Sequence, residues 1–263
     1  MKKRLIFVFS VAAILTSALF VGCAKKESVV LESPIGIIGA MDSEVNSLKE
    51  SAGITKTTTI ASMEFCEGRL GTKNIVIVKC GMGKVNAGIC AHTLVHYFGC
   101  TKIINTGVAG SLDGRLDIGD IVVSTDAVQH DFDVSPIGFK KGEIPYTGRY
   151  SFPADETLRK AAVNAISEAT DEVKFFEGRV CSGDQFIFTS EQKQKITNEF
   201  SGMCCEMEGG AIAQVCWLNK VPFVIIRAVS DKQDGTAPTE YHTFEALSAA
   251  RCAKIVQYMV KNM

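Results

Sequence analysis

The chain has 263 residues, of which 46% are hydrophobic and 22% are charged, and its formal net charge is −1 at pH 7. This length and apolar content suffice for one large globular domain, and they exclude a low-complexity chain without a core. The near balance of charge excludes the basic face that nucleic-acid binding requires, so we expect no nucleic-acid partner.

The first residues resemble a secretory signal. A short basic run precedes the apolar run Leu5–Val21, and the stretch Phe20–Cys23 resembles the bacterial lipoprotein box. We therefore expect residues 1–22 to be a signal peptide and residues 23–33 to be a tether that begins at a lipidated Cys23. This interpretation places the protein on the exported side of a cell membrane, held by its lipid alone. An uncleaved anchor helix and a plain secreted protein are the alternatives.

The rest of the chain alternates short apolar runs with amphipathic segments. In chain order, we expect strands over 35–40, 57–62, 65–70, 74–79, 102–105, 120–128, 175–182 and 222–228, and helices over 42–53, 84–98, 155–170, 191–198, 208–218 and 241–259. Residues 107–110 are expected to form a small-residue loop, and residues 134–153 a long loop rich in proline and glycine. Strands that alternate with helices predict a single α/β domain over 34–263 with a mostly parallel or mixed central sheet.

The cysteines and histidines do not form a pattern of ligands or bridges. Ten cysteines in an exported chain would suggest disulfides. Most of them, however, lie within or beside apolar segments, and no Cys-x-x-Cys pair occurs, so we expect buried free thiols. The four histidines show no ligand spacing with these cysteines, and we expect no metal.

Carboxylates and small residues recur at the carboxyl ends of the expected strands, where α/β sheets bind their ligands. The segments concerned are 39–44, 80–84, 105–110, 182–187, 205–208 and 227–231. The first strand is not followed by the Gly-x-Gly-x-x-Gly pattern of dinucleotide folds, and neither a Gly-x-Ser-x-Gly elbow nor a P-loop occurs. The expected pocket therefore contains carboxylates and does not hold a dinucleotide.

A series of short motifs, in order along the chain, resembles the bacterial 5′-methylthioadenosine/S-adenosylhomocysteine nucleosidases of the purine nucleoside phosphorylase-like family. The motifs are Ile35–Val45, Gly81–Val85, Ile104–Gly110, Gly119–Ser124, His130–Val134, Ser182–Ile187, Glu206–Glu208 and Arg227–Asp231. The resemblance implies a mixed sheet partly closed as a barrel, surrounded by helices, in a homodimer. It also implies hydrolysis of the N-glycosidic bond of 5′-methylthioadenosine and S-adenosylhomocysteine, and also of 5′-deoxyadenosine, without a cofactor.

The same resemblance assigns the catalytic residues. Asp231 would protonate N7 of the leaving adenine, with Ser230 orienting its carboxyl group. A carboxylic acid does this near neutral pH only if desolvation raises its pKa. Glu44, with Arg227 nearby, would activate water on the opposite face of the sugar, as in inverting glycosidases. Glu208 would bind the ribose hydroxyls and help to stabilise positive charge on the ring.

Further residues would bind substrate. Phe186 would stack on adenine, the Ile187 backbone would bind the edge of the base, and Met41 and the Met207 backbone would lie against the sulfur and the sugar. Ala109 and Gly110 belong to the small-residue loop beside the substrate. We expect the neighbouring subunit to complete the alkylthio pocket with Val134, Ile137, Phe139 and Pro145.

Four positions are less clear. Val108 stands where many relatives carry Ser, which puts the fine positioning of water in question. Either Tyr241 or Phe244 would be the aromatic residue that closes over the ligand. Glu206, two residues before Glu208 in an extended segment, is expected to point to the other face and to have a structural role.

Other functions stay open at this point. A nucleoside phosphorylase on the same fold would need cations for phosphate, whereas the segment Met41–Glu44 is acidic. A hydrolase for a futalosine-like nucleoside or for AMP would use the same chemistry. A lipid-anchored nucleoside-binding protein would have no use for an acid and a base across the glycosidic bond.

Overall fold

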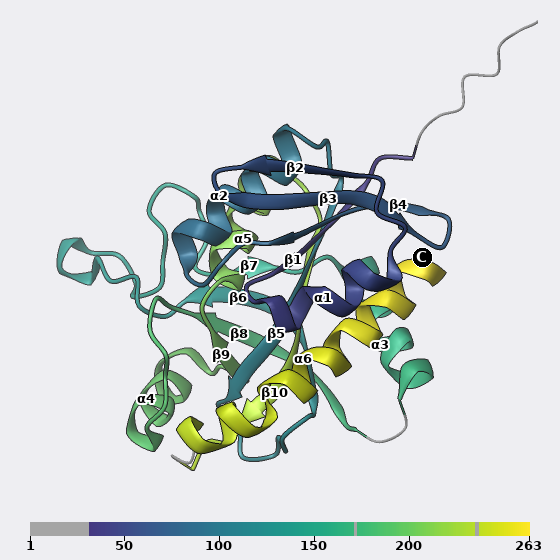
Figure 1. Cartoon of the computed structure of the whole chain (residues 1–263). Helices are drawn as coiled ribbons and strands as arrows, with labels where there is room; N and C mark the ends of the chain where they lie inside the picture. The colour runs from purple at the N-terminus through teal and green to yellow at the C-terminus, as the bar shows by residue number, and fades with distance from the viewer. Residues whose placement is uncertain (1–31, 171–172, 235–236) are drawn as a thin grey trace, which may run out of the picture. The chain divides into compact units, whose positions relative to one another are not determined.

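The computed structural model describes residues 32–170, 173–234 and 237–263, and it is built on one ten-stranded mixed sheet (Figure 1). The strands follow the order β10-β6-β8-β9-β5-β1-β4-β3-β2, and β7 pairs with β6. Because β10 also pairs with β5, the strands β5, β10, β6, β8 and β9 close into a barrel. This confirms the predicted α/β fold with a partly closed mixed sheet.

The elements in chain order are β1 (Ile35–Gly39), α1 (Asp42–Ser51), β2 (Lys56–Ile60), β3 (Met63–Leu70), β4 (Lys73–Lys79), α2 (Lys84–His96), β5 (Lys102–Ser111), β6 (Ile121–Gln129), the short 3-10 helix η1 (Ser135–Ile137), β7 (Phe152–Pro153), α3 (Glu156–Ala169), β8 (Phe175–Ser182), α4 (Ser190–Phe200), β9 (Cys204–Glu206), α5 (Gly209–Asn219), β10 (Phe223–Asp231) and α6 (Ala237–Asn262).

Helices cover both faces of the sheet. Figure 1 shows α1, α3 and α6 side by side, and α6 packs on β5 and β10. Helices α2 and α5 pack together on the opposite side. The central strand β1 is buried at every residue, with Ile37 in the core beneath α1 and α6 and Ile38 in the core beneath α2. A strand covered on both faces is a continuous apolar run, which is why the sequence of β1 does not alternate.

Strands β5 and β10 are longer than expected. The predicted loop over 107–110 is wrong, because β5 continues to Ser111 and pairs with β10 and β9 along this part. Gly107 is needed in this strand for space: a Cβ there would come within 3.0 Å of both Glu44 and Arg227. Strand β10 likewise extends to Asp231, so the expected acid lies at the end of a strand.

Two elements near the site were missed or misplaced. The short strand β9 joins β5 to β8, where the sequence analysis expected no strand between the helices over 191–198 and 208–218. Helix α6 begins at Ala237, so the polar loop after β10 is shorter than expected. Three residues are too few for a period-2 pattern to be visible, and β9 is therefore specified by its neighbours in the barrel.

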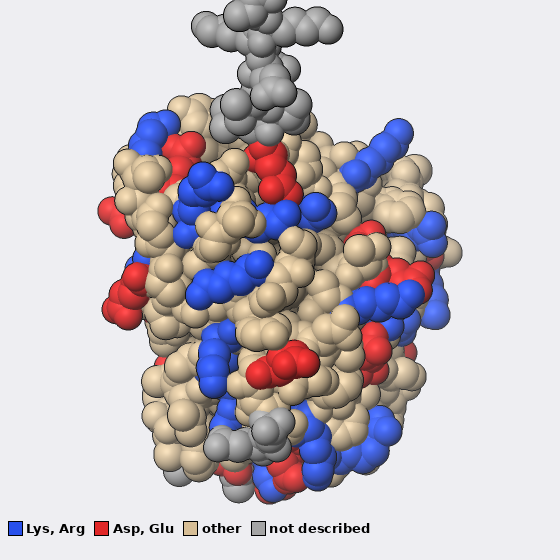
Figure 2. All heavy atoms as spheres, turned by 90° about the vertical axis from the view of Figure 1, so that its right-hand side faces the viewer, with Lys and Arg blue, Asp and Glu red and all other residues tan. Residues whose placement is uncertain are grey.

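The surface shown in Figure 2 carries Lys and Arg interspersed with Asp and Glu. This agrees with the balanced charge of the sequence. All cysteines from Cys66 to Cys252 are buried free thiols, as predicted.

Candidate active site

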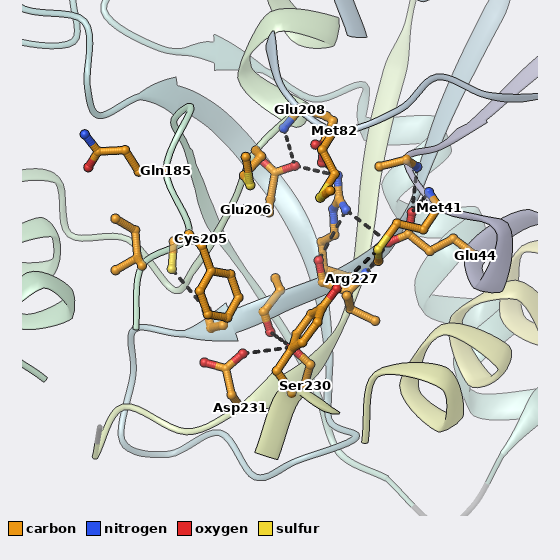
Figure 3. Close-up of a pocket in the computed structure, with 18 residues that line it drawn as sticks. Met41, Glu44, Met82, Gln185, Cys205, Glu206, Glu208, Arg227, Ser230 and Asp231 are labelled. Carbon is orange, nitrogen blue, oxygen red and sulfur yellow. Dashed lines mark hydrogen bonds and ion pairs between the residues drawn. The ribbon is translucent and has the colours of Figure 1, made fainter. Parts of the chain in front are cut away.

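A pocket lies at the carboxyl ends of β1, β5, β9 and β10 (Figure 3). Its lining consists of Ala40, Met41, Glu44, Met82, Val108, Ala109, Gly110, Gln185, Phe186, Ile187, Cys205, Glu206, Met207, Glu208, Arg227, Ser230, Asp231 and Tyr241. Every residue that the sequence analysis assigned to catalysis or substrate binding within the chain is in this set. The structure therefore brings together residues that are up to 201 positions apart in sequence (Ala40 to Tyr241).

Glu44 is held in the first turn of α1 by backbone donors. Its Oε2 atom accepts from the N–H groups of Ala40 (2.6 Å) and Met41 (3.0 Å), and its Oε1 atom accepts from the N–H of Val108 (3.0 Å). Burial raises the pKa of Glu44, although Arg227 and the three N–H groups act in the opposite direction. The carboxylate is thus fixed in place and more basic than an exposed glutamate, which suits a general base.

Arg227, on β10, binds three carboxylates. Its Nη2 atom lies 2.5 Å from Glu206 Oε2 and 3.5 Å from Glu208 Oε2, and its Nη1 atom lies 3.8 Å from Glu44 Oε1. The same Nη2 donates to Asn105 Oδ1 at 2.6 Å. Burial disfavours the charged guanidinium, but the three carboxylates outweigh it and raise the pKa of Arg227. Figure 3 shows this cluster at one end of the pocket and Asp231 at the other.

The expected orientation of Glu206 is wrong, because its carboxylate also faces this pocket. Glu206 Oε2 accepts from the N–H groups of Glu208 (2.9 Å) and Gly209 (2.8 Å), and Ser182 Oγ donates to Oε1. The turn between β9 and α5 curls the chain around this carboxylate, so the alternation of an extended strand does not apply. Its expected structural role agrees with these contacts, which leave Glu208 facing the cavity.

Glu208 occupies the N-cap position of α5, but its side chain makes no capping hydrogen bond to this helix. Its Oε1 atom accepts from the N–H of Gly83 at 2.9 Å, at a position whose φ of 98° favours glycine. Burial, followed by repulsion from Glu206, raises the pKa of Glu208 to about 7, against the attraction of Arg227. The charge of Glu208 therefore changes within the neutral pH range.

Asp231 is buried at the other end of the pocket. Ser230 Oγ donates to Asp231 Oδ1 at 2.8 Å, as the expected orienting role of Ser230 requires. The sequence analysis missed the second partner, Lys193 on α4, whose Nζ donates to Asp231 Oδ2. A signal for it existed: Lys193 shares one face of α4 with the buried residues Ile196 and Phe200, at the spacing i, i+3, i+7.

Tyr241 is the aromatic residue of α6 that reaches the pocket, and Phe244 is not in the lining. The Tyr241 ring lies edge-on to Phe186, with centroids 5.3 Å apart, and its hydroxyl donates to Met41 Sδ at 3.2 Å. The four residues expected to act in a neighbouring subunit's pocket, Val134, Ile137, Phe139 and Pro145, are also outside the lining.

The closed barrel and this acidic pocket define the class of protein. The family model of the Phosphorylase superfamily matches residues 34–261, and the chain belongs to this superfamily. Among curated relatives, the 5′-methylthioadenosine/S-adenosylhomocysteine nucleosidases of Shewanella loihica and Staphylococcus epidermidis are 40% and 39% identical over 230 residues, which is 87% of this chain and 99% and 100% of theirs. These relatives confirm the predicted family and enzyme class, a nucleosidase.

Comparison with solved structures agrees with this family assignment. The nucleosidase of Neisseria meningitidis bound to methylthio-immucillin-A superposes with a TM-score of 0.84 at 35% identity, covering 88% of this chain and 100% of the other. The futalosine hydrolase of Helicobacter pylori superposes with a TM-score of 0.83 at 31% identity, covering 88% and 98%.

The predicted location at a cell membrane is wrong. It depended on the first 23 residues alone, whereas the curated nucleosidases align over nearly their whole lengths with 87% of this chain. The predicted signal peptide and the lipidated Cys23 lie outside the described residues. Among the residues that the structure describes, no helix is long and apolar enough to cross a membrane.

Proposed function

We propose that this chain hydrolyses the N-glycosidic bond of 5′-methylthioadenosine and S-adenosylhomocysteine, and also of 5′-deoxyadenosine, releasing adenine and the corresponding ribose. Residues 34–263 form the nucleosidase domain in this proposal. The observation that carries it is the separation of two buried carboxylates at opposite ends of one pocket: Glu44, in the cluster with Arg227 and Glu208, and Asp231.

The proposed chemistry follows from that separation. Asp231 donates a proton to adenine N7, because a neutral adenine is a better leaving group than its anion. As the C1′–N9 bond breaks, its electron pair moves to N9 and positive charge develops on the sugar. Water adds to C1′ from the opposite face and loses a proton to Glu44, whose raised pKa suits a base. Glu208 binds the ribose hydroxyls and stabilises the developing charge.

The remaining lining residues hold the substrate in this proposal. Phe186 stacks on adenine, and the Ile187 backbone binds the edge of the base. Tyr241 closes over the ligand from α6 together with Met41, to which its hydroxyl already donates.

The charge of the pocket favours water over phosphate as the nucleophile. The lining carries the carboxylates Glu44, Glu206, Glu208 and Asp231 against one cation, Arg227. That cation is already paired with three of them. A phosphate dianion would meet repulsion from these carboxylates and no unpaired cation among the lining residues. A nucleoside phosphorylase is therefore disfavoured.

A homodimer completes the proposal. An exposed apolar patch lies at the start of α2 and just before it; its residues are Met82, Val85 and Ile89, with 60%, 74% and 43% exposure. Exposed apolar patches mark interfaces. Met82 also lines the pocket, so a second copy seated on this patch would reach the mouth of the site. It would bring Val134, Ile137, Phe139 and Pro145 toward the alkylthio group.

The test is adenine release by the purified protein from 5′-methylthioadenosine, in phosphate-free buffer and again with added phosphate. We expect equal rates in both buffers, with free methylthioribose as the second product. A requirement for phosphate would make the protein a phosphorylase. Tight binding without release would make it a binding protein, and faster cleavage of futalosine would change the substrate.

A further inference from the structure

Lys193 is a buried cation placed against the proposed acid. Its side chain is 0% exposed and that of Asp231 is 2% exposed. Lys193 Nζ donates to Asp231 Oδ2 and to the carbonyl oxygen of Lys232, while Ser230 Oγ donates to Asp231 Oδ1. Both oxygens of the Asp231 carboxyl group are therefore held by the protein itself.

Packing does not explain a lysine at this position. The other buried side chains on its face of α4, Ile196 and Phe200, are apolar, and an apolar residue would continue their contacts. Burying an ammonium group is costly, and a buried ion pair is often no more stabilising than apolar residues of similar volume. The lysine therefore needs an explanation in the chemistry of Asp231, its anionic partner.

The neighbouring thiol and phenol do not share this role. Cys205, on β9, and Tyr241, on α6, are the titratable groups that approach Asp231 from these elements. Burial raises the pKa of each to about 12, so both are neutral near pH 7. Neither group can neutralise Asp231 or replace its proton in that pH range.

The other charged groups nearby have partners of their own. Glu206 is bound to Arg227. The Lys232 side chain points to Asp117, 3.0 Å away, while its backbone N–H donates to Glu240 Oε2 at 2.7 Å. Among the described residues, Lys193 is thus the cation whose ammonium group contacts Asp231.

We propose that Lys193 is a positioning residue for the acid step and that Lys193 and Asp231 jointly carry the proton that adenine N7 receives. The inference rests on the proposed function, because it takes Asp231 as the proton donor. As the C1′–N9 bond breaks, Asp231 gives a proton to N7 and takes one from Lys193 Nζ. Lys193 is left neutral, and Glu44 holds the proton released by water. Solvent then returns a proton to Lys193 and removes one from Glu44, which balances the cycle.

The pair explains how a buried carboxylate can serve as an acid while it contacts an ammonium group. Without Lys193, the proton must reside on Asp231 itself before adenine enters. An ionised Asp231 would then have no proton to give. With Lys193, the ionised pair still holds a transferable proton.

The experiment compares Lys193→Met with Lys195→Met, a control on the exposed side of the same helix. We expect Lys193→Met to lower kcat by about 10²-fold or more, with KM changed by less than about threefold. The alkaline limb in the pH profile of kcat for Lys193→Met should move to lower pH. Lys195→Met should match the wild type in all three quantities.

A double-mutant cycle separates the proposed role from a structural one. In an Asp231→Asn background, Lys193→Met should change kcat by less than about twofold. That background has no carboxyl group through which Lys193 could pass a proton to adenine. Equal losses in both backgrounds, or a wild-type pH profile for Lys193→Met, would overturn the inference. If Lys193→Met does not fold, Lys193→Gln, which keeps a hydrogen-bond donor without charge, should show the same loss and the same shift.

The two proposals fail in different ways. Full activity of Asp231→Asn would refute Asp231 as the acid and, with it, the inference. An inactive Asp231→Asn beside a fully active Lys193→Met would refute the inference alone.

Discussion

The backbone N–H of Val108, on β5, donates to Glu44 Oε1, on α1, at 3.0 Å. This bond fixes the proposed base to the barrel without using the Val108 side chain. The Val108 side chain cannot form a hydrogen bond, and the geometry shows why Glu44 is nevertheless held: any residue with a backbone N–H supplies the same donor.

We therefore predict that Val108→Ser changes kcat/KM by less than about threefold, whereas Glu44→Gln lowers it by about 10²–10⁴-fold. The amide of Gln cannot accept the proton of water, although it fits the same space. Adenine release under identical conditions measures both. A large effect of Val108→Ser would show that the side chain at this place, and not the backbone bond, positions the water.

Asp231→Asn should lose about 10²–10⁴-fold in kcat and keep its affinity for adenine. The amide keeps the size of the carboxyl group and its bond with Ser230 Oγ, but it has no acidic proton for N7. Single-turnover kinetics and calorimetric titration with adenine measure the two quantities. Near-normal turnover would remove Asp231 as the acid, and lost adenine binding would make its role one of affinity.

The pH dependence of kcat/KM should have an acidic limb with a midpoint of about 7, because the pKa of Glu208 is raised to about 7. Ionised Glu208 binds the ribose hydroxyls, so protonation below that pH weakens substrate capture. A pH series with the wild type and Glu208→Gln tests this. The variant should be slow at all pH values and lack the limb, and an unchanged limb would assign it to another group.

Glu208 should also destabilise the folded protein at alkaline pH. Its pKa rises from 4.5 to about 7 on folding, so the folded state binds more protons between these values. The free energy of unfolding contributed by this group is then present below 4.5 and is lost as pH rises through about 7. Glu208→Gln removes the buried charge and should raise the stability by about 2 kcal/mol at pH 8. Thermal unfolding of Glu208→Gln and of the exposed control Glu191→Gln would show whether the gain is specific.

Gly107→Ala should destabilise the protein by about 1–3 kcal/mol and abolish most activity. The added Cβ would come within 3.0 Å of Glu44 Oε1 and Arg227 Nη1 and displace both. Gly53→Ala is the matched control, because a Cβ there meets nothing within 4 Å. Chemical denaturation and adenine release on both variants measure the difference, and equal stability of the two would contradict the assigned packing at Gly107.

Val85→Glu should convert the proposed dimer to a monomer, because it places a charge in the apolar patch on α2. Leu247→Glu, at an exposed position on α6, should leave the dimer intact. Sedimentation velocity distinguishes the two forms. A wild-type protein that sediments as a monomer at micromolar concentration would refute the dimer itself.

Sequence alone was sufficient for the parts of the site that lie in local motifs. Glu44, Glu208 and Asp231 each lie in one of the short motifs that carry the family resemblance, and each lines the pocket. The structural features that the sequence did not reveal depend on closure of the barrel. Strand β9 exists because β5 and β8 flank it, and Gly107 belongs to a strand because β10 pairs with it.

Lys193 shows the same limit for a side chain. On a helix, a lysine next to charged and polar residues normally faces water. The spacing of Lys193 with Ile196 and Phe200 indicates that it is buried, but nothing local to α4 indicates that Asp231, 38 residues further along, lies opposite. The predicted location at a cell membrane was wrong for the converse reason: it depended on a strong local pattern in the first 23 residues, whereas the curated relatives align over nearly their whole lengths with 87% of this chain.

Closure of the barrel also has a consequence for how the chain folds. Phe223 pairs with Ile103, so the seam between β10 and β5 joins segments 120 residues apart. Contacts between such distant segments are slow to form, because the intervening chain must first be ordered. The proposed acid, Asp231, lies on β10, and the proposed base, Glu44, is hydrogen-bonded to Val108 on β5. Catalytic activity should therefore return only in the slowest refolding phase, after most of the helical signal has recovered.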